Sequence, residues 1–290
     1  MKRVLTLCVA LLLLSVLTAP ASVITNFWAT FDNHDYGFEE DEDSVFANQD
    51  NLNAGTEIGS WEDPTRRASI IEYSTRGPNN QYAAFRSNSA APPYEITALP
   101  SMAADLSLGV EFSFLTRLWV GSDTEDNIED SAHFIELRDT SDNTLVTLRI
   151  MGSAAGEPED MFTHLHYHIG DQWQLASTNL QQRRLATPAY FVHWDQIKLV
   201  MNEDEFDIQF ANEREGTLET IVSGVEWNLP AGTQIGSIFF TNTDANEEES
   251  EARFIRYDDV LLVTIPEPGV GALLAMAGLC LLLGRRMRRV

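Results

Sequence analysis

The chain has 290 residues, with 44 acidic and 19 basic residues, a net charge of -25, 44% hydrophobic residues and 10% aromatic residues. This composition excludes a disordered acidic tail, because a chain this apolar buries enough surface to offset the entropy lost on folding. The charge excludes nucleic acid as a partner, since phosphate binding needs clustered Lys and Arg, and the largest such cluster lies at the C-terminal end, among residues 285–289.

The two cysteines, Cys8 and Cys280, both lie in apolar segments near the chain ends. The region between those segments therefore has no thiol for a disulfide bond, a zinc site or nucleophilic catalysis.

Residues 1–21 have the features of a signal peptide. Lys2 and Arg3 precede an apolar run over residues 4–17, which is followed by Ala19-Pro20-Ala21. This order of charged, apolar and small residues predicts secretion and cleavage before Ser22. A helix of 14 residues is about 21 Å long, shorter than the roughly 30 Å hydrocarbon core of a bilayer, so we expect export rather than anchoring at this end.

In residues 22–265 the apolar residues repeat with a period of two, which is the pattern of strands that bury one face. We predict about a dozen strands, at 24–31, 69–74, 82–86, 106–114, 135–137, 146–150, 162–169, 197–201, 206–210, 218–222, 235–241 and 253–264. Polar turns at 139–143 and 202–204 predict two hairpins.

No window of 12 or more residues in this region has the apolar stripe of a helix, which argues against crossover helices and a parallel sheet. There is also no internal repeat. We therefore predict one all-β domain over 22–265, a two-sheet antiparallel sandwich or jelly roll.

The charge of the predicted domain is more extreme than that of the whole chain. Without the six basic residues near the ends and Glu267, 13 basic and 43 acidic residues remain, a net charge of -30. Such a surface repels polyanions, so we expect any bound polysaccharide to be neutral or calcium-bridged.

The C-terminal region, 266–290, combines three features. Pro266, Glu267 and Pro268 precede an apolar stretch over 269–284, and an arginine cluster follows it, formed by Arg285, Arg286, Arg288 and Arg289. The prolines end any helix that enters from the domain, the stretch is just long enough to cross a bilayer, and the arginines stay cytoplasmic. A plain single-span anchor explains this pattern, with the domain outside the membrane.

The same three features, in this order, resemble the PEP-CTERM sorting signal of Gram-negative bacteria that make exopolysaccharide. The resemblance covers about the last 25 residues. It implies transient residence in the inner membrane, processing by an exosortase-type membrane peptidase near Pro266-Glu267-Pro268, and transfer to the cell surface or extracellular matrix.

A second resemblance spans most of the domain. Its pieces are Phe31-Asp32, Ile58-Gly59-Ser60-Trp61, the stretch 106–114, Gly236-Ser237-Ile238 and Tyr257-Asp258-Asp259-Val260. In this order they resemble concanavalin A-like and laminin-G-like jelly rolls. The resemblance implies glycan binding or glycoside hydrolysis, often with a structural calcium.

Calcium requires six to eight oxygen ligands. We expect Asp32, near the first strand, and Asp258 or Asp259, near the last, to be its ligands, because the terminal strands of jelly rolls commonly lie side by side. Consecutive strand residues face opposite sides, so at most one of Asp258 and Asp259 should point at the site. The acidic runs 39–43 and 123–130 are expected to be solvated loops.

His164, His166 and His168 alternate with apolar residues and would line one face of a strand. Histidines two residues apart on a strand can bind zinc or copper. The simpler interpretation, which we favour, is that the opposite apolar face is buried and the histidines face water.

No catalytic motif is present. Laminarinase-like members of the fold carry Glu-x-Asp-x-x-Glu, and no window of the sequence has this pattern. A Gly-x-Ser-x-Gly elbow and a phosphate-binding loop are also missing. Of the six tryptophans, Trp173 lies among turn-forming and polar residues and is expected to be the most exposed.

The sequence therefore predicts an exported, non-catalytic protein of the cell envelope or exopolysaccharide matrix, which binds glycans or has a structural role. The alternative is a glycoside hydrolase or lyase of the same fold. A third hypothesis is an adhesive surface protein without defined sugar specificity.

Overall fold

The structure, a computed structural model, describes residues 22–31, 52–53, 56–65, 68–72, 81–87, 93–119, 132–153, 162–170, 172–180, 194–211, 216–242 and 253–266. Thr25–Thr264 forms one compact unit. Its described elements are strands, apart from the 3-10 turn η1 (Leu106–Leu108) and helical backbone at Leu52 and Asn53. The prediction of an all-β domain is confirmed.

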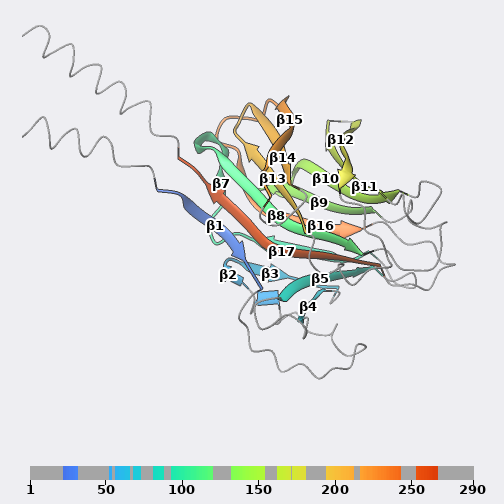
Figure 1. Cartoon of the computed structure of the whole chain (residues 1–290). Helices are drawn as coiled ribbons and strands as arrows, with labels where there is room; N and C mark the ends of the chain where they lie inside the picture. Colours follow the sequence, from blue (N-terminus) through green and yellow to red (C-terminus); the bar gives the residue numbers. More distant parts are fainter. Residues whose placement is uncertain are drawn as a thin grey trace, which may run out of the picture. The chain divides into compact units, whose positions relative to one another are not determined.

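The described strands form two antiparallel sheets (Figure 1). The main path of the nine-stranded sheet runs through β15 (Glu219–Glu226), β14 (Glu205–Ala211), β13 (Asp195–Met201), β8 (Val110–Trp119), β17 (Arg253–Thr264), β1 (Ile24–Ala29) and β2 (Thr56–Ile58). Two further strands extend it, because β5 (Gln81–Ser87) pairs with β17 and β4 (Ala68–Glu72) pairs with β5.

The eight-stranded sheet faces the first. Its main path runs through β12 (Gln172–Leu180), β11 (Phe162–Ile169), β10 (Thr144–Ser153), β9 (Ala132–Asp139), β16 (Gln234–Asn242), β6 (Glu95–Leu99) and β3 (Ser60–Glu62). The two-residue strand β7 (Ala104–Asp105) pairs with β16. This arrangement is consistent with the predicted jelly-roll sandwich.

Both predicted hairpins are confirmed. In the β13–β14 hairpin Ile197 lies opposite Phe210, and the Asn202 side chain accepts hydrogen bonds from the backbone N–H groups of Asp204 and Glu205. In the β9–β10 hairpin Leu148 lies opposite Ile135. The period-two pattern therefore identified the buried faces of these strands correctly.

The prediction of one continuous strand over 106–114 was wrong at its start. Leu106–Leu108 forms η1, and the strand begins at Val110. The turn forms because the Asp105 side chain accepts a hydrogen bond from the Ser107 N–H and Gly109 adopts a positive φ of 82°. Leu106 is therefore buried, whereas Leu108 is 38% exposed.

The prediction missed five strands, namely β2, β3, β6, β7 and β12. The first two are joined by Gly59, where the chain passes from the nine-stranded to the eight-stranded sheet. Gly59 has a φ of 97°, and an added Cβ would lie 2.5 Å from the Phe27 ring. The crossing therefore requires glycine.

Trp61 on β3 joins the inner faces of the two sheets. It is 1% exposed, and its ring centroid lies 5.2–6.1 Å from the rings of Phe27, Phe31, Phe85 and Phe240. The first three belong to β1, to the residues after it and to β5, whereas Phe240 belongs to β16. We call Trp61 and these four phenylalanines the aromatic cluster.

Two buried tyrosines extend this packing. Tyr257 on β17 lies 5.0 Å from Phe85 and 5.1 Å from Phe240. A hydrogen bond of 2.8 Å links the Tyr94 hydroxyl to Nδ1 of His133, and both side chains are fully buried. Burial raises the pKa of Tyr94 and of Tyr257 well above the usual range of tyrosine.

The first and last strands, β1 and β17, lie side by side, as predicted (Figure 1). Asn26 fastens them, because its Oδ1 accepts a hydrogen bond of 3.0 Å from the Thr264 hydroxyl. Its Nδ2 donates to the carbonyl groups of Met102 and Ala103. One buried amide thus links the two ends of the domain to the segment before β7.

Replacing Trp61 with alanine should lower the free energy of unfolding by about 3–5 kcal/mol, because it leaves a cavity between the sheets. The matched control is Trp28→Ala, since Trp28 lies on β1 but is 40% exposed. We expect this change to cost about 1 kcal/mol or less. Urea denaturation measures both values, and equal losses would show that the aromatic cluster has no special role.

Candidate functional site

The candidate site lies on the outer face of the eight-stranded sheet, the face that points away from the core. Leu148, Ile150, Leu165 and Tyr167 point inward from β10 and β11 and are buried. Because side chains alternate along a strand, the residues between them point outward. We call the outward side chains of β9–β12 the β9–β12 face.

The strand registers align the outward side chains in two rows. The first row, from β12 to β6, consists of Trp173, His168, Thr147, Glu136, Phe239 and Thr97. The second row, in the same order, consists of Leu175, His166, Arg149, Phe134, Thr241 and Glu95.

Trp173 is the central aromatic residue of this face. Its ring centroid lies 4.9 Å from His168 and 6.0 Å from Phe134, and the Arg149 guanidinium carbon lies 4.3 Å above the ring. Strands are about 4.8 Å apart, so Trp173 reaches from β12 across β11 toward β10 and β9. It is nevertheless 39% exposed, which leaves part of the ring accessible to a ligand.

On the inner side of these strands, Tyr167 links β11 to its neighbours. The Tyr167 hydroxyl donates a hydrogen bond of 2.5 Å to Oε1 of Gln174, which joins β11 to the edge strand β12. Burial raises the pKa of Tyr167, so this hydroxyl remains a donor at neutral pH. The Tyr167 ring contacts Phe206 of the opposite sheet at 5.8 Å. Contacts of Tyr167 therefore fix β11, the strand that carries the histidines, to β12 and to the opposite sheet.

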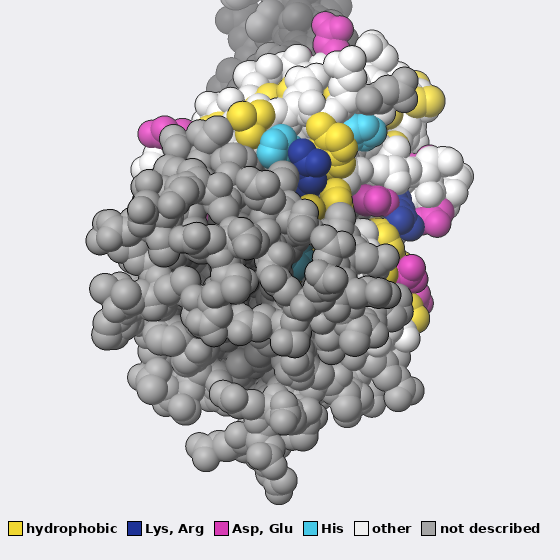
Figure 2. All heavy atoms as spheres, turned by 90° about the vertical axis from the view of Figure 1, so that its right-hand side faces the viewer, with side chains coloured by type: hydrophobic (Ala, Val, Ile, Leu, Met, Phe, Trp, Pro, Cys, Tyr) yellow, Lys and Arg dark blue, Asp and Glu magenta, His cyan; other side chains and the backbone are white. Residues whose placement is uncertain are grey.

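Arg149 is partly withdrawn from water on this face. Burial lowers the pKa of its guanidinium, although an arginine remains charged at neutral pH. Figure 2 shows basic, histidine and hydrophobic side chains gathered together on this side of the molecule. The combination offers an aromatic surface for stacking next to hydrogen-bond donors.

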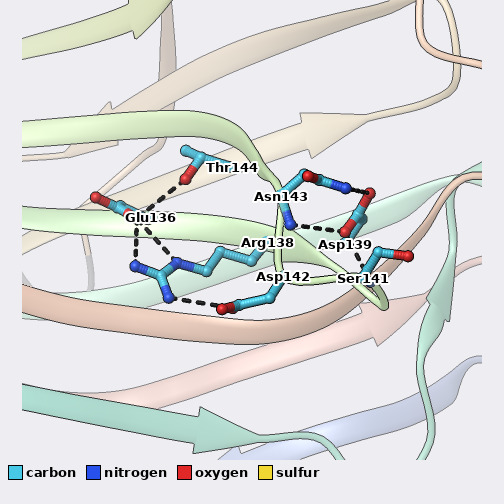
Figure 3. A network of polar contacts seen from close by, with 7 residues as sticks. All are labelled: Glu136, Arg138, Asp139, Ser141, Asp142, Asn143 and Thr144. Atoms are coloured by element: carbon cyan, nitrogen blue, oxygen red, sulfur yellow. Dashed lines mark hydrogen bonds and ion pairs between the residues drawn. The ribbon is translucent and has the colours of Figure 1, made fainter.

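A polar network borders the face at the β9–β10 turn (Figure 3). Arg138 donates to Oε2 of Glu136 through Nε at 2.9 Å and forms an ion pair of 3.1 Å with Asp142. Its guanidinium carbon lies 3.8 Å from the centre of the Phe239 ring. The charge of Arg138 is thus balanced within the protein.

The turn itself is held by Asp139. Its carboxylate accepts hydrogen bonds from the side chain and backbone N–H of Asn143 and from the backbone N–H of Ser141. The Asn143 hydrogen bonds lower the pKa of Asp139, so the carboxylate remains charged. The acidic residues of this turn therefore have a structural role.

The alternation predicted for the histidine strand is present. Leu165 and Tyr167 face the core, whereas His166 and His168 are half-buried on the outer face. The side chain of His164 lies outside the described residues. Within the described ranges, no three His, Cys, Asp or Glu side chains lie together as a metal-binding group.

The predicted calcium ligands lie near a β-bulge in β17. Asp258 is 1% exposed, and its Oδ1 accepts a hydrogen bond of 2.9 Å from the Asp259 N–H. Asp259 has a φ of 47°, and the register with β8 shifts between Asp258 and Leu261. The bulge interrupts the expected simple alternation.

The bulge lies where β17 ceases to pair with β5, whose pairing ends at Tyr257. The neighbouring strand β1 ends at Ala29, the described segment that contains it ends at Phe31, and Asp32 lies outside the described residues. Asp258 and Asp259 alone provide too few oxygen atoms for calcium, so the described residues do not assemble a calcium site.

The remaining predicted site residues also lie outside the described ranges. These are Glu267, Pro268 and the arginines Arg285, Arg286, Arg288 and Arg289, whereas Pro266 is the last described residue. In the part of the chain that the structure describes, no helix is long and apolar enough to cross a membrane.

Arg149 and Phe134 are not among the site residues predicted from the sequence. Their alternation with Leu148 and Ile135 placed them on the outer face, but no local pattern showed which strand would lie beside them. Trp173 was expected to be the most exposed tryptophan; it is exposed at 39%, but Trp28 is equally exposed at 40%. Only the pairing of β9, β10, β11 and β12 brings these side chains together.

No protein-family model and no curated protein matches this sequence. Solved structures with a similar fold include a carbohydrate esterase from the Shiga toxin-encoding bacteriophage phi24B, at 11% identity and a TM-score of 0.47, covering 84% of this chain and 99% of the esterase. An alginate lyase from Chlorella virus has 8% identity and a TM-score of 0.46, with 76% and 100% covered.

The catalytic domain of a GH131 beta-glucanase from Podospora anserina has 13% identity and a TM-score of 0.43, with 73% of this chain and 86% of that domain covered. At identities and TM-scores this low, the similarities assign neither a family nor a function to this chain.

Proposed function

We propose that this is an exported, non-catalytic protein that binds polysaccharide on the β9–β12 face. The observation that carries the proposal is the exposed ring of Trp173, which lies on Arg149, His168 and Phe134. An aromatic face stacks on the apolar C–H face of a pyranose, and neighbouring donors bind its hydroxyl groups. A sheet face that carries such side chains on several neighbouring strands suits an extended polymer.

The support for Trp173 as a platform is its fixed orientation. A ligand loses less affinity to side-chain ordering when the contacting ring is already held by its neighbours. Here the ring contacts side chains from three other strands, β9, β10 and β11. We therefore expect the orientation of the Trp173 ring to change little when a sugar binds.

We further propose that the chain is sorted as a PEP-CTERM protein. The support is the order Pro266-Glu267-Pro268, apolar stretch and arginine cluster, together with the signal peptide predicted at the other end. An exosortase would process the tail in the inner membrane, and the protein would then reach the cell surface or matrix, where polysaccharide is present.

Binding to a panel of bacterial and algal polysaccharides tests the glycan proposal. We expect at least one to bind, and Trp173→Ala to weaken that binding by about tenfold, because a stacking contact contributes about 1–1.5 kcal/mol. Trp28→Ala, which removes an equally exposed ring from β1, should leave binding unchanged. Release of reducing sugars or unsaturated products would instead identify an enzyme.

The mass of the mature protein tests the sorting proposal. Processing by an exosortase predicts a product that lacks the apolar stretch and the arginine cluster. Mass spectrometry of the protein purified from the surface fraction should therefore show a C-terminus near Pro266-Glu267-Pro268. An intact C-terminus in the membrane fraction would identify a plain anchor.

A chelator tests the expected structural calcium at Asp32, Asp258 and Asp259. A ligand that binds only the native state raises its stability, so we expect the Tm to fall when calcium is removed and to recover when it is restored. The same experiment on Asp258→Asn should show a smaller change. A Tm that is insensitive to chelator would reject the ion.

A further inference from the structure

We propose that Arg149 anchors a sugar carboxylate, so that the polysaccharide bound on the β9–β12 face contains uronate residues. This inference rests on the proposed glycan-binding function and names the class of sugar. It replaces the expectation, based on the net charge, that an acidic glycan requires bridging calcium.

Arg149 differs from the other basic side chains that the structure describes. The structure describes three basic side chains in all, and the other two have carboxylate partners: Arg138 pairs with Glu136 at 2.8 Å, and Lys198 pairs with Glu111 at 2.5 Å. Arg149 has no carboxylate partner among the described residues, and its buried Nε has no hydrogen-bond acceptor there. The domain has 43 acidic and 13 basic residues, so an arginine without a carboxylate is unexpected.

The described neighbours of Arg149 do not neutralise its charge. In its row, His166 lies opposite on β11 and Phe134 lies opposite on β9, and neither is acidic. Glu136 is the next outward residue after Phe134 on β9. It already accepts hydrogen bonds from Arg138 and from the Thr144 hydroxyl. These described neighbours thus supply no anion for Arg149.

This arrangement fits a carboxylate ligand. A guanidinium is a planar donor that binds a carboxylate through two parallel hydrogen bonds, and such bonds are stronger when water is partly excluded. Partial burial, which lowers the pKa of Arg149, provides that exclusion. The guanidinium carbon lies 4.3 Å from the centre of the Trp173 ring, and Trp173 would stack on the ring of the same sugar.

The strong negative charge of the domain does not prevent this binding. At physiological ionic strength the Debye length is about 8 Å, so distant surface carboxylates are largely screened. The charges within one or two strand spacings of the ligand decide the interaction. Among the described side chains there, Arg149 is the one cation without an anionic partner.

The test compares oligogalacturonate with its fully methyl-esterified form, which keeps the sugar ring and loses the charge. The protein is expressed with its full sequence, purified in the form that the cell produces, and assayed at physiological ionic strength without added divalent cations. We expect the acid to bind roughly tenfold or more tightly than the ester, since hydrogen bonds to charged groups contribute about 1.5–3 kcal/mol.

Arg149→Gln should abolish this preference and weaken binding of the acid by roughly 10- to 100-fold. Arg149→Lys keeps the charge but loses the planar fork, so it should retain part of the preference. Lys198→Gln is the matched control, because it makes the same charge change on the opposite sheet. It should leave the preference intact.

Equal binding of acid and ester, or a preference that survives Arg149→Gln, would overturn the inference. If neutral polysaccharides still bound and Trp173→Ala still weakened them, the proposed function would stand without it. Failure of every glycan, acidic and neutral, to bind would overturn both. A thermal melt of each variant confirms folding, and Arg149→Lys decides the outcome if Arg149→Gln does not fold.

Discussion

The packing of aromatic side chains between the two sheets is the interaction on which the rest of the structure depends. Trp61 belongs to β3, a strand of the eight-stranded sheet, and contacts Phe27 and Phe85 of the nine-stranded sheet. Residues 22–265 contain no cysteine, so no disulfide can hold the sheets together. Burial of apolar surface must therefore supply the stability, and large aromatic rings bury the most area per residue.

This inner packing also determines what the outer face presents. Each strand that buries Leu148 or Leu165 must point Arg149 or His166 outward, because successive side chains alternate. A shift of one residue would bury the charged side and expose the apolar side, so the core fixes the register. The site is then a consequence of the packing beneath it.

The net charge of the domain does not show how its individual basic side chains are paired. An excess of acidic residues makes it easy for a basic side chain to find a carboxylate partner. Arg138 and Lys198 follow this rule and have structural roles. Arg149 does not follow it, because no described carboxylate pairs with it. This difference from Arg138 and Lys198 is the basis of the carboxylate proposal, and the net charge alone does not reveal it.

The sequence by itself determined the all-β class, the two hairpins and the inward faces of the main strands, because these depend on period-two patterns within single segments. It failed where local contacts override the pattern, as at Leu106–Leu108, and where strands such as β3 and β7 are too short for a pattern to show. It also placed the histidines on one face of a strand and Trp173 at the surface.

Only the tertiary structure decided that Trp173, Arg149, His168 and Phe134 meet on one face. They come from four strands, and their proximity depends on the order β12-β11-β10-β9 and on the register of each pair. A strand carries no local signal for which edge its neighbour will occupy, since backbone hydrogen bonds are the same for any partner. The chain therefore determines the faces of its strands locally, and the global packing of the core selects which faces lie side by side.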